Sequence, residues 1–160
     1  MRSPSEPLRL LVIGRDRAGK GTAAGILAEL LGLSWRSSCN LAPAPAPVDQ
    51  LLAEGHGICV GMRSRVEFEA VRHLFDAVIW VDGGDRVPPE HPVSMELNPG
   101  DADLYLWNGG EIPALEVAAR RVAVALILGR VVGAKKMPGA GGAGHSVSGR
   151  SREDGGPSCV

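Results

Sequence analysis

Several features that would point to a particular class of protein are scarce in this sequence. Its 17 lysine and arginine residues nearly balance its 18 aspartate and glutamate residues, so we expect no broad surface for nucleic acid or another polyanion. The three cysteines, Cys39, Cys59 and Cys159, are widely spaced and form no C-x-x-C pattern. They are therefore expected to be reduced thiols, with no disulfide framework and no zinc cluster.

Long hydrophobic runs are also missing. The longest, residues 122–128, is far shorter than the roughly 20 residues that span a bilayer. The first seven residues, MRSPSEP, lack the apolar stretch of a secretion signal. Together these features predict a cytoplasmic protein that binds neither membrane nor nucleic acid. Lysine is scarce as well, because Lys20 is the only lysine before Lys135 in a chain that otherwise uses arginine.

What the sequence does contain is a strong motif in residues 8–33, LRLLVIGRDRAGKGTAAGILAELLGL. A short apolar run is followed by a glycine-rich turn and then by a helical pattern. The turn, GRDRAGKGT, fits G-x-x-x-x-G-K in the order of strand, loop and helix that a phosphate-binding loop requires. The plainer interpretation, a glycine-rich turn capped by a threonine, explains neither the full pattern nor the isolated lysine.

The residue types of this turn suit a nucleotide. Glycines let the backbone approach an anion closely, and the N–H groups at the start of the next helix favour negative charge. Lys20 is predicted to reach the β- and γ-phosphates of ATP, and the Thr22 hydroxyl to lie near Mg²⁺. The predicted contacts to ATP in the turn are Gly14, Arg17, Ala18, Gly19, Lys20, Gly21 and Thr22.

Apolar runs alternate with helical patterns along the rest of the chain. Strands are predicted at 8–13, 33–36, 57–62, 77–81 and 104–107, and helices at 20–31, 48–54, 66–75 and 112–132, with a turn of helix at 93–97. This order predicts an α/β fold, a P-loop NTPase-type three-layer sandwich with a mostly parallel sheet. We expect a flexible leader at 1–7, one domain at 8–134, and a disordered glycine- and serine-rich tail at 135–160.

Helical spacing also predicts which side chains are buried. On the first helix, which Gly32 should end, they are Ala23, Ile26, Leu27, Leu30 and Leu31. On the helix at 66–75 they are Val66, Ala70, Val71, Leu74 and Phe75. On the last helix they are Leu115, Ala118, Ala119, Val122, Leu126 and Leu128. The acidic pairs Asp101/Asp103 and Glu153/Asp154 are expected to be solvated.

The turns after the predicted strands carry polar and glycine residues. In a parallel sheet these turns meet at one edge, so residues 14–22, 63–65, 82–86 and 108–110 should converge there. Arg63 and Arg65 could clamp phosphate oxygens, and Glu67 could orient Arg63. From the residues alone, an ordinary solvated helix face with surface ion pairs is the favoured interpretation of this second group.

A family resemblance changes that balance. The chain resembles the bacteriophage-type deoxynucleoside monophosphate kinases, a branch of the P-loop nucleoside monophosphate kinases. Their loop, G-x-x-R-x-G-K-D-T, is similar to residues 14–22, and their D-x-R-x-x-x-E segment is similar to residues 61–67. A later arginine and strand, a loop with H-x-x-S/E character and a strand ending in N-G are matched by Arg72, residues 77–81, 91–96 and 107–110.

The resemblance implies transfer of the ATP γ-phosphoryl group to a deoxynucleoside monophosphate, with Mg²⁺ as cofactor. The residues it implies for charge neutralisation during transfer are Lys20, Arg17, Arg63 and Arg86. It places Asn108 and Gly109 beside the donor base, and gives the acceptor nucleotide Ser38, Asn40, Arg63 and Glu67.

Three departures from the family pattern keep other functions open. Gly21 and Gly61 stand where the family has aspartate, and the segment that should hold the acceptor is only about twenty-five residues long. A nucleotide-binding regulatory or interaction protein with little transfer is therefore the main alternative, and a kinase of another small acceptor such as dephospho-coenzyme A is a third. His91 is favoured as a plain loop residue, and a homodimer is left open. Trp107 is the one tryptophan that is a candidate base-stacking platform, because it precedes the loop that faces the nucleoside in this fold.

Overall fold

The computed structural model describes residues 3, 5–38 and 46–135. Five strands form one sheet in the order β2-β3-β1-β4-β5, and each neighbouring pair is parallel. The strands are β1 (Leu10–Ile13), β2 (Trp35–Ser37), β3 (Ile58–Val60), β4 (Ala77–Asp82) and β5 (Leu104–Trp107). The α-helices are α1 (Lys20–Leu31), α2 (Ala46–Ala53), α3 (Arg65–Val71) and α4 (Ile112–Lys135).

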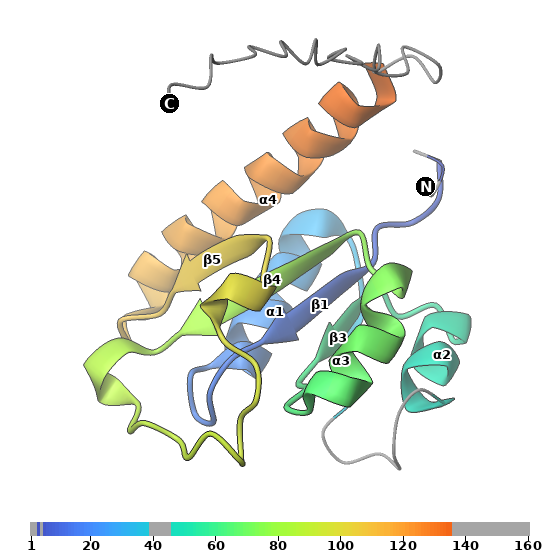
Figure 1. Cartoon of the computed structure of the whole chain (residues 1–160). Coiled ribbons are helices and arrows are strands. Elements are labelled where there is room, and N and C mark those ends of the chain that lie inside the picture. The colour runs from blue at the N-terminus through green and yellow to red at the C-terminus, as the bar shows by residue number, and fades with distance from the viewer. Residues whose placement is uncertain (1–2, 4, 39–45, 136–160) are drawn as a thin grey trace, which may run out of the picture.

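Helices cover both faces of this sheet, so the predicted three-layer α/β fold is confirmed (Figure 1). Successive residues of β1 point to opposite faces. Leu10 and Val12 pack with the core under α1 and α4, whereas Leu11 and Ile13 pack with the core under α2 and α3. All four are fully buried. Burial on both faces explains why this strand reads in the sequence as a continuous apolar run.

The parallel register brings the loops that follow the strands to one edge of the sheet. The last residue of β1, Ile13, lies beside Trp80 of β4, and Asp82 at the end of β4 lies beside Trp107 at the end of β5. On the other side, Val12 of β1 is paired with Val60 of β3. The loops after β1, β3, β4 and β5 therefore start close together, as expected from the strand order.

The first helix has the predicted bounds and the predicted end. It begins after Gly19 and ends at Gly32, whose left-handed backbone donates its N–H to the carbonyl of Ala28. Its predicted buried face is partly wrong, because Leu30 is 42 % exposed. Ile26 and Leu31 are partly buried, and the buried residues that face the sheet and α4 are Ala23 and Leu27, as predicted, together with Ala24 and Ala28. These are mostly small side chains, which let the helix pack closely.

The helix predicted at 66–75 is shorter, and of its predicted buried residues Val71 and Phe75 are buried and Leu74 is partly buried. α3 ends at Val71, and a 3-10 turn, η1 (Arg72–Leu74), completes the segment. Phe68 and Val71 are buried, whereas Val66 is 75 % exposed and Ala70 is also exposed. The segment 93–97 forms no helix, only a hydrogen-bonded turn at 92–94. The strands predicted at 8–13, 33–36 and 57–62 are shorter or shifted by one to two residues.

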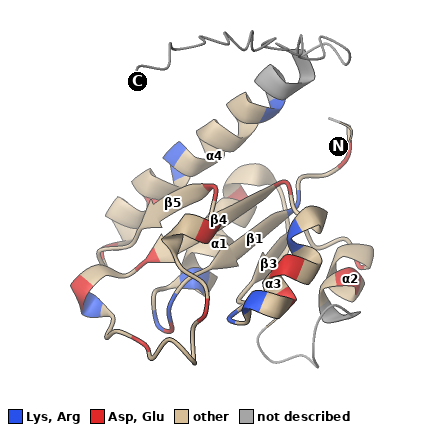
Figure 2. Cartoon of the chain, viewed as in Figure 1, with Lys and Arg blue, Asp and Glu red and all other residues tan. Residues whose placement is uncertain are grey.

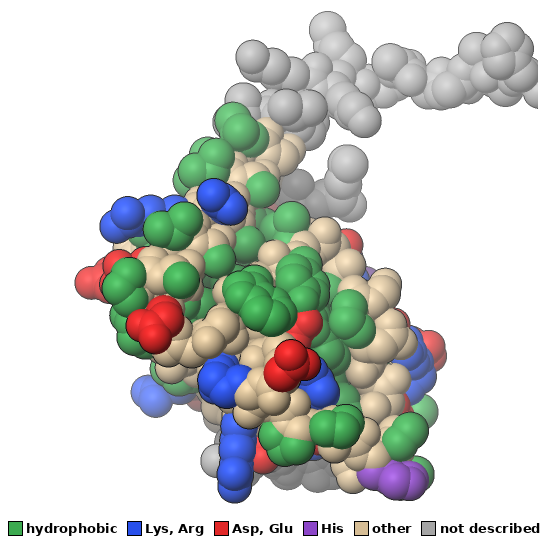
Figure 3. Space-filling model, turned by 90° about the vertical axis from the view of Figure 1, so that its left-hand side faces the viewer, with side chains coloured by type: hydrophobic (Ala, Val, Ile, Leu, Met, Phe, Trp, Pro, Cys, Tyr) green, Lys and Arg blue, Asp and Glu red, His purple; other side chains and the backbone are tan. Residues whose placement is uncertain are grey.

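The last helix is longer than predicted, and part of its apolar surface is uncovered. Its buried side chains are Leu115, Ala119, Val122, Ala123 and Leu126. Leu128 was expected among them but is 57 % exposed. Apolar side chains lie exposed along α4 and over the neighbouring β5 (Figure 3). Within the described residues, no helix combines the length and the apolar character needed to cross a membrane.

Of the Asp101/Asp103 pair, Asp103 is exposed as expected, with its side chain 46 % accessible, whereas the Asp101 side chain is only 13 % exposed. Asp101 accepts hydrogen bonds from Arg65, 2.5 Å from Nη1 and 3.0 Å from Nη2. These bonds outweigh partial burial and lower the pKa of the Asp101 carboxyl. Asp103 accepts from Arg72 and from the N–H of Val78, both at 2.7 Å. The two carboxylates thus join the loop before β5 to α3, η1 and β4.

The ends of the chain are described only in part. Arg130 of α4 donates to the carbonyls of Ser3 and Glu6, at 3.4 and 2.5 Å, so part of the predicted leader contacts the last helix. Of the predicted tail, Lys135 is the last residue of α4. Residues 136–160, with the Glu153/Asp154 pair, lie outside the described residues.

Candidate nucleotide-binding site

The loop between β1 and α1, residues 14–19, is the segment predicted to bind phosphate and is called the phosphate loop below. At two points its backbone has a conformation that residues other than glycine rarely adopt. Gly14 has φ +155°, and a Cβ there would lie 2.4 Å from the carbonyl oxygen of Val81 in β4. Gly19 has φ +87°, and a Cβ there would lie 2.2 Å from Nδ2 of Asn108. Both positions therefore need glycine for backbone conformation and for close packing. The absence of side chains at these two positions lets the loop pack directly against the ends of β4 and β5.

The start of α1 is prepared for an anion. Its N-cap, Gly19, has no side chain to accept from the first N–H groups of the helix, and its first turn contains no acidic residue. Backbone N–H groups at a helix start have no acceptor within the helix and carry partial positive charge, so they favour phosphate oxygens. Lys20, half-buried, lies over this loop and donates from Nζ to the carbonyl of Arg15 at 2.6 Å.

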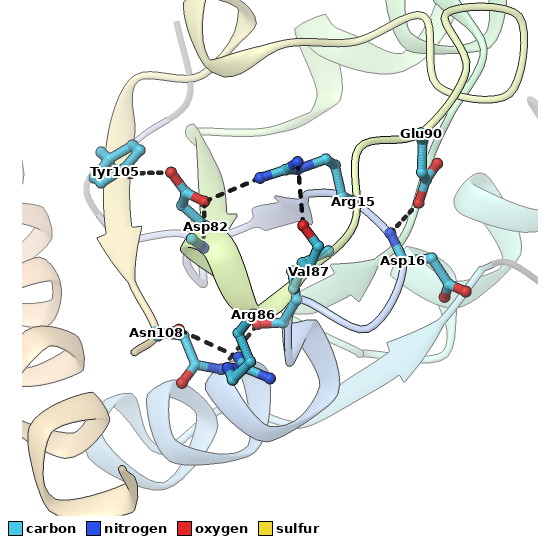
Figure 4. Close-up of polar contacts among 10 residues, drawn as sticks. Arg15, Asp16, Asp82, Arg86, Val87, Glu90, Tyr105 and Asn108 are labelled. Carbon is cyan, nitrogen blue, oxygen red and sulfur yellow. Dashed lines mark hydrogen bonds and ion pairs between the residues drawn. The ribbon is translucent and has the colours of Figure 1, made fainter. Parts of the chain in front are cut away.

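Asn108 holds the loop in place. Among the described residues, Asn108 is the one polar residue classed with the buried core, and it is only 6 % exposed. Its Nδ2 donates to the carbonyl of Ala18 at 2.8 Å, and its Oδ1 accepts from the N–H of Gly110 at 3.1 Å. Arg86 donates to the Asn108 carbonyl at 3.2 Å (Figure 4). The side chain predicted to line the donor base therefore braces the phosphate loop.

A cluster around Asp82 fixes the other side of the loop. Asp82 ends β4 and accepts from the N–H of Gly84 at 2.8 Å and from the hydroxyl of Tyr105 (Figure 4). Arg15, from the phosphate loop, lies 3.6 Å from its Oδ1. Burial raises the pKa of the Asp82 carboxyl, but these hydrogen bonds and the charge of Arg15 together lower the pKa by more than burial raises it. The net shift of the pKa is therefore downward. Burial and the bond to Asp82 raise the pKa of Tyr105 to about 12.

A second cluster links the phosphate loop to the loop after β4. Arg63 donates from Nη1 to Oε2 of Glu90 at 2.7 Å, and its Nη2 lies 3.8 Å from Oδ1 of Asp16. The other oxygen of Glu90, Oε1, accepts from the backbone N–H of Asp16 (Figure 4). The carboxylate that orients Arg63 is therefore Glu90, not Glu67 as expected. Glu90 lies 27 residues away in sequence, and no local spacing indicates the contact.

These residues border an open cavity of about 450 Å³ next to the phosphate loop. Side chains that hydrogen-bond or carry charge make up most of its wall: Asp16, Arg17, Arg63, Glu90, His91 and Ser94. Charged residues of both signs are interspersed around this edge of the sheet (Figure 2). Such a wall can bind a small polar molecule through several hydrogen bonds, and the guanidinium groups of Arg17 and Arg63 can bind a phosphate group beside it.

The remaining predicted site residues lie in different places. Arg17, at φ +57°, is exposed on the loop, and Thr22 is exposed in the first turn of α1. Ser38 donates from Oγ to the carbonyls of Val60 and Gly61, at 3.1 and 2.5 Å, so its hydroxyl joins β2 to the end of β3. Asn40 lies outside the described residues. Arg65 turns away from the loop toward Asp101.

The fit to Mg²⁺ rests on few protein groups. Among the described residues, no three His, Cys, Asp or Glu side chains gather to hold a metal ion. Mg²⁺ beside a nucleotide needs only one or two protein oxygens, because phosphates and water supply the rest. The exposed Thr22 hydroxyl at the start of α1 provides one such oxygen. The site therefore fits Mg²⁺ carried by a nucleotide, not a metal held by protein alone.

Comparisons with known proteins point to the fold. No protein-family model matches the chain, and no curated protein matches it. An unliganded sugar kinase from Janibacter sp. HTCC2649 aligns with 79 % of this chain and 98 % of its own, with a TM-score of 0.52 at 16 % identity. A gluconokinase from Sinorhizobium meliloti 1021 aligns with 77 % of this chain and 97 % of its own, with a TM-score of 0.47 at 14 % identity. The first likeness shows that this chain shares the fold of that structure.

Proposed function

We propose that this chain is an ATP-dependent phosphotransferase that moves the γ-phosphoryl group to a hydroxyl of a small polar acceptor. The observation that carries the proposal is the uncapped start of α1 behind the glycine loop, with Lys20 lying over it. A helix start without a side-chain cap leaves several N–H groups for phosphate oxygens. The strand, loop and helix around it have the sequence and the fold in which such a loop binds nucleotides.

The donor would bind through the loop and the cations beside it. Backbone N–H groups and Lys20 bind the phosphates, and Arg17 and Arg63 neutralise charge on the transferring group. Bound Mg²⁺, with Thr22 as one ligand, would neutralise charge between the phosphates. Asn108 and Asp82 act on the donor indirectly. Asn108 fixes the backbone of the phosphate loop through the Ala18 carbonyl, and Asp82 fixes the Arg15 side chain of that loop.

The acceptor would occupy the 450 Å³ cavity. None of the described residues that line it is Phe, Tyr or Trp, so a nucleobase would find only the His91 ring to stack on. Carboxylates, guanidinium groups, a histidine and a serine instead suit several hydroxyl groups. We therefore favour a sugar or sugar acid over the deoxynucleoside monophosphate implied by the family resemblance. The Janibacter structure, a sugar kinase, supports this choice.

The chemistry needs one base. An acceptor hydroxyl oxygen forms a bond to the γ-phosphorus while the bond from that phosphorus to the ADP oxygen breaks. The hydroxyl proton passes to a carboxylate, and we assign this role to Asp16, which lines the cavity with its side chain 67 % exposed. Positioning and charge neutralisation then supply the rest of the catalysis, as is usual for phosphoryl transfer.

A product assay tests this proposal. The full chain is incubated with MgATP and, separately, with monosaccharides, sugar acids, deoxynucleoside monophosphates and dephospho-coenzyme A, and products are identified by mass spectrometry. We expect ADP and a phosphorylated sugar or sugar acid, and neither from the Asp16→Asn variant. A deoxynucleoside diphosphate would keep the transfer but overturn the acceptor class.

A nucleotide-binding protein without transfer is the second candidate. One observation favours it: β3 is followed by Gly61 and Met62, so the strand next to β1 supplies no carboxylate near the phosphate loop. Saturable ATP binding with no phosphorylated product from any acceptor in the panel would support this candidate and refute the transferase.

A further inference from the structure

Glu90 is held in an unusual way for a residue of a surface loop. Its side chain is only 15 % exposed, and both of its carboxylate oxygens have partners. One oxygen accepts from the backbone N–H of Asp16, inside the phosphate loop, and the other accepts from Arg63 at 2.7 Å. A carboxylate is withdrawn from water only where such charge-assisted bonds replace its hydration.

The two partners of Glu90 are groups that the donor phosphate needs. A backbone N–H of a glycine-rich loop and an arginine side chain are the usual contacts of a phosphoryl oxygen. Arg63 also donates to the carbonyl of Ser94 at 3.2 Å, so the same guanidinium ties residues 90–94 to the phosphate loop. A carboxylate of the chain itself thus lies where an anion of the substrate would bind.

We propose that Glu90 is a built-in competitor for the donor phosphate, which keeps the loop after β4 closed against the phosphate loop until ATP binds. The inference rests on the proposed donor site. The γ-phosphate carries more charge and more oxygens than a carboxylate, so it takes over the Asp16 N–H and Arg63. Glu90 is then released, and residues 88–94, which line the acceptor cavity, move with it.

This exchange has two consequences. The closed pair lowers the apparent affinity for the donor, because part of the binding energy is spent on breaking it. It also makes the acceptor cavity depend on the donor, since the wall of that cavity changes when Glu90 leaves. Donor binding is therefore expected to precede acceptor binding.

The first test compares tripolyphosphate binding, in the presence of Mg²⁺, by the full chain and two variants. Glu90→Gln keeps the length of the side chain but removes its charge. Glu69→Gln makes the same chemical change at an exposed position of α3. We expect calorimetry to show a Kd for Glu90→Gln about three to thirty times lower than for the unmodified chain, because the bonds from Arg63 and the Asp16 N–H then end on a neutral amide in place of a carboxylate. Glu69→Gln should leave the Kd unchanged.

The second test needs no variant. Hydrogen exchange at the amides of residues 90, 91 and 93–95 should become faster when tripolyphosphate is added, because the closing contacts are lost. An unchanged or weaker affinity in Glu90→Gln, or exchange that is unchanged or slower on adding the ligand, would overturn the role of Glu90. Absence of tripolyphosphate binding by the folded, unmodified chain would instead refute the proposed donor site, and the inference would fall with it.

Discussion

Replacing Asn108 by alanine should loosen the phosphate loop from the outside, without touching a residue that contacts the donor. The substitution removes the Nδ2 group that donates a hydrogen bond to the Ala18 carbonyl at 2.8 Å. It also removes the Oδ1 atom that accepts a hydrogen bond from the Gly110 N–H at 3.1 Å. Leaving a buried carbonyl without its partner costs about 1–3 kcal/mol, and losing the second, partly buried bond adds about 0.5–1.5 kcal/mol. The expected total is about 2–4 kcal/mol in the free energy of unfolding.

Thermal and urea unfolding can measure this loss. In a chain of this size, each kcal/mol shifts the melting temperature by about 2–4 °C, so Asn108→Ala should melt roughly 5–15 °C lower. The affinity for MgATP should fall as well, because Gly19 packs against the Asn108 amide and the loop loses that support. The lower melting temperature and the lower affinity have the same cause, because the buried Asn108 side chain donates through Nδ2 and accepts through Oδ1.

Asn98→Ala is the matched control. Asn98 is exposed and accepts from the N–H of Gly100 at 2.8 Å, and water can replace that bond. It should cost less than Asn108→Ala and leave the MgATP affinity unchanged. If Asn108→Ala unfolded at the same temperature and urea concentration as the unmodified chain, the bracing role derived from its two hydrogen bonds would be wrong.

Three further predictions follow from single groups. Lys20→Ala should lower the MgATP affinity at least tenfold while the chain still unfolds cooperatively; equal affinity would remove Lys20 from the site. Tyr105 is the only tyrosine of the chain, so ultraviolet titration should show its phenol ionising near pH 12, and Asp82→Asn should bring that pKa back toward 10. Because the folded pKa is the raised one, the contribution of Tyr105 to stability is present below about pH 10 and lost as pH rises through 12; a midpoint at 10 in the folded chain would contradict it. Burial raises the pKa of the Cys59 thiol to about 11, so a thiol reagent at pH 8 should modify Cys59, located by peptide mass mapping, only after unfolding.

The fold could be predicted from the sequence because its signals are local. β1 and β4 are buried on both faces and read as unbroken apolar runs, and Gly19 and Gly32 delimit α1 where the pattern indicated. The glycine-rich loop before α1 could be located for the same reason, since Gly14, Gly19 and Lys20 lie within seven residues. Helix faces were less predictable: Leu30 and Leu128 fit the periodicity, yet the neighbouring elements leave them exposed.

The contacts that shape the site could not be predicted, because they join segments far apart in sequence. Glu90 meets Asp16 across 74 residues, and Asn108 meets Ala18 across 90 residues. Local spacing favours Glu67, four residues after Arg63, as the partner of Arg63, whereas the fold brings Glu90 to it. Asp82 could have been noticed as the acidic end of a buried strand, but its partner Tyr105 lies on the adjacent strand β5.

The central claim is that residues 14–22 bind the phosphates of a nucleoside triphosphate. The most direct measurement is an NMR titration of the isotopically labelled full chain with MgATP, following the backbone amides of the loop. The account predicts large, saturable shifts at Gly19, Lys20 and Gly21. If these amides stayed unshifted at millimolar MgATP, or if the shifts gathered on another part of the molecule, the claim would be contradicted.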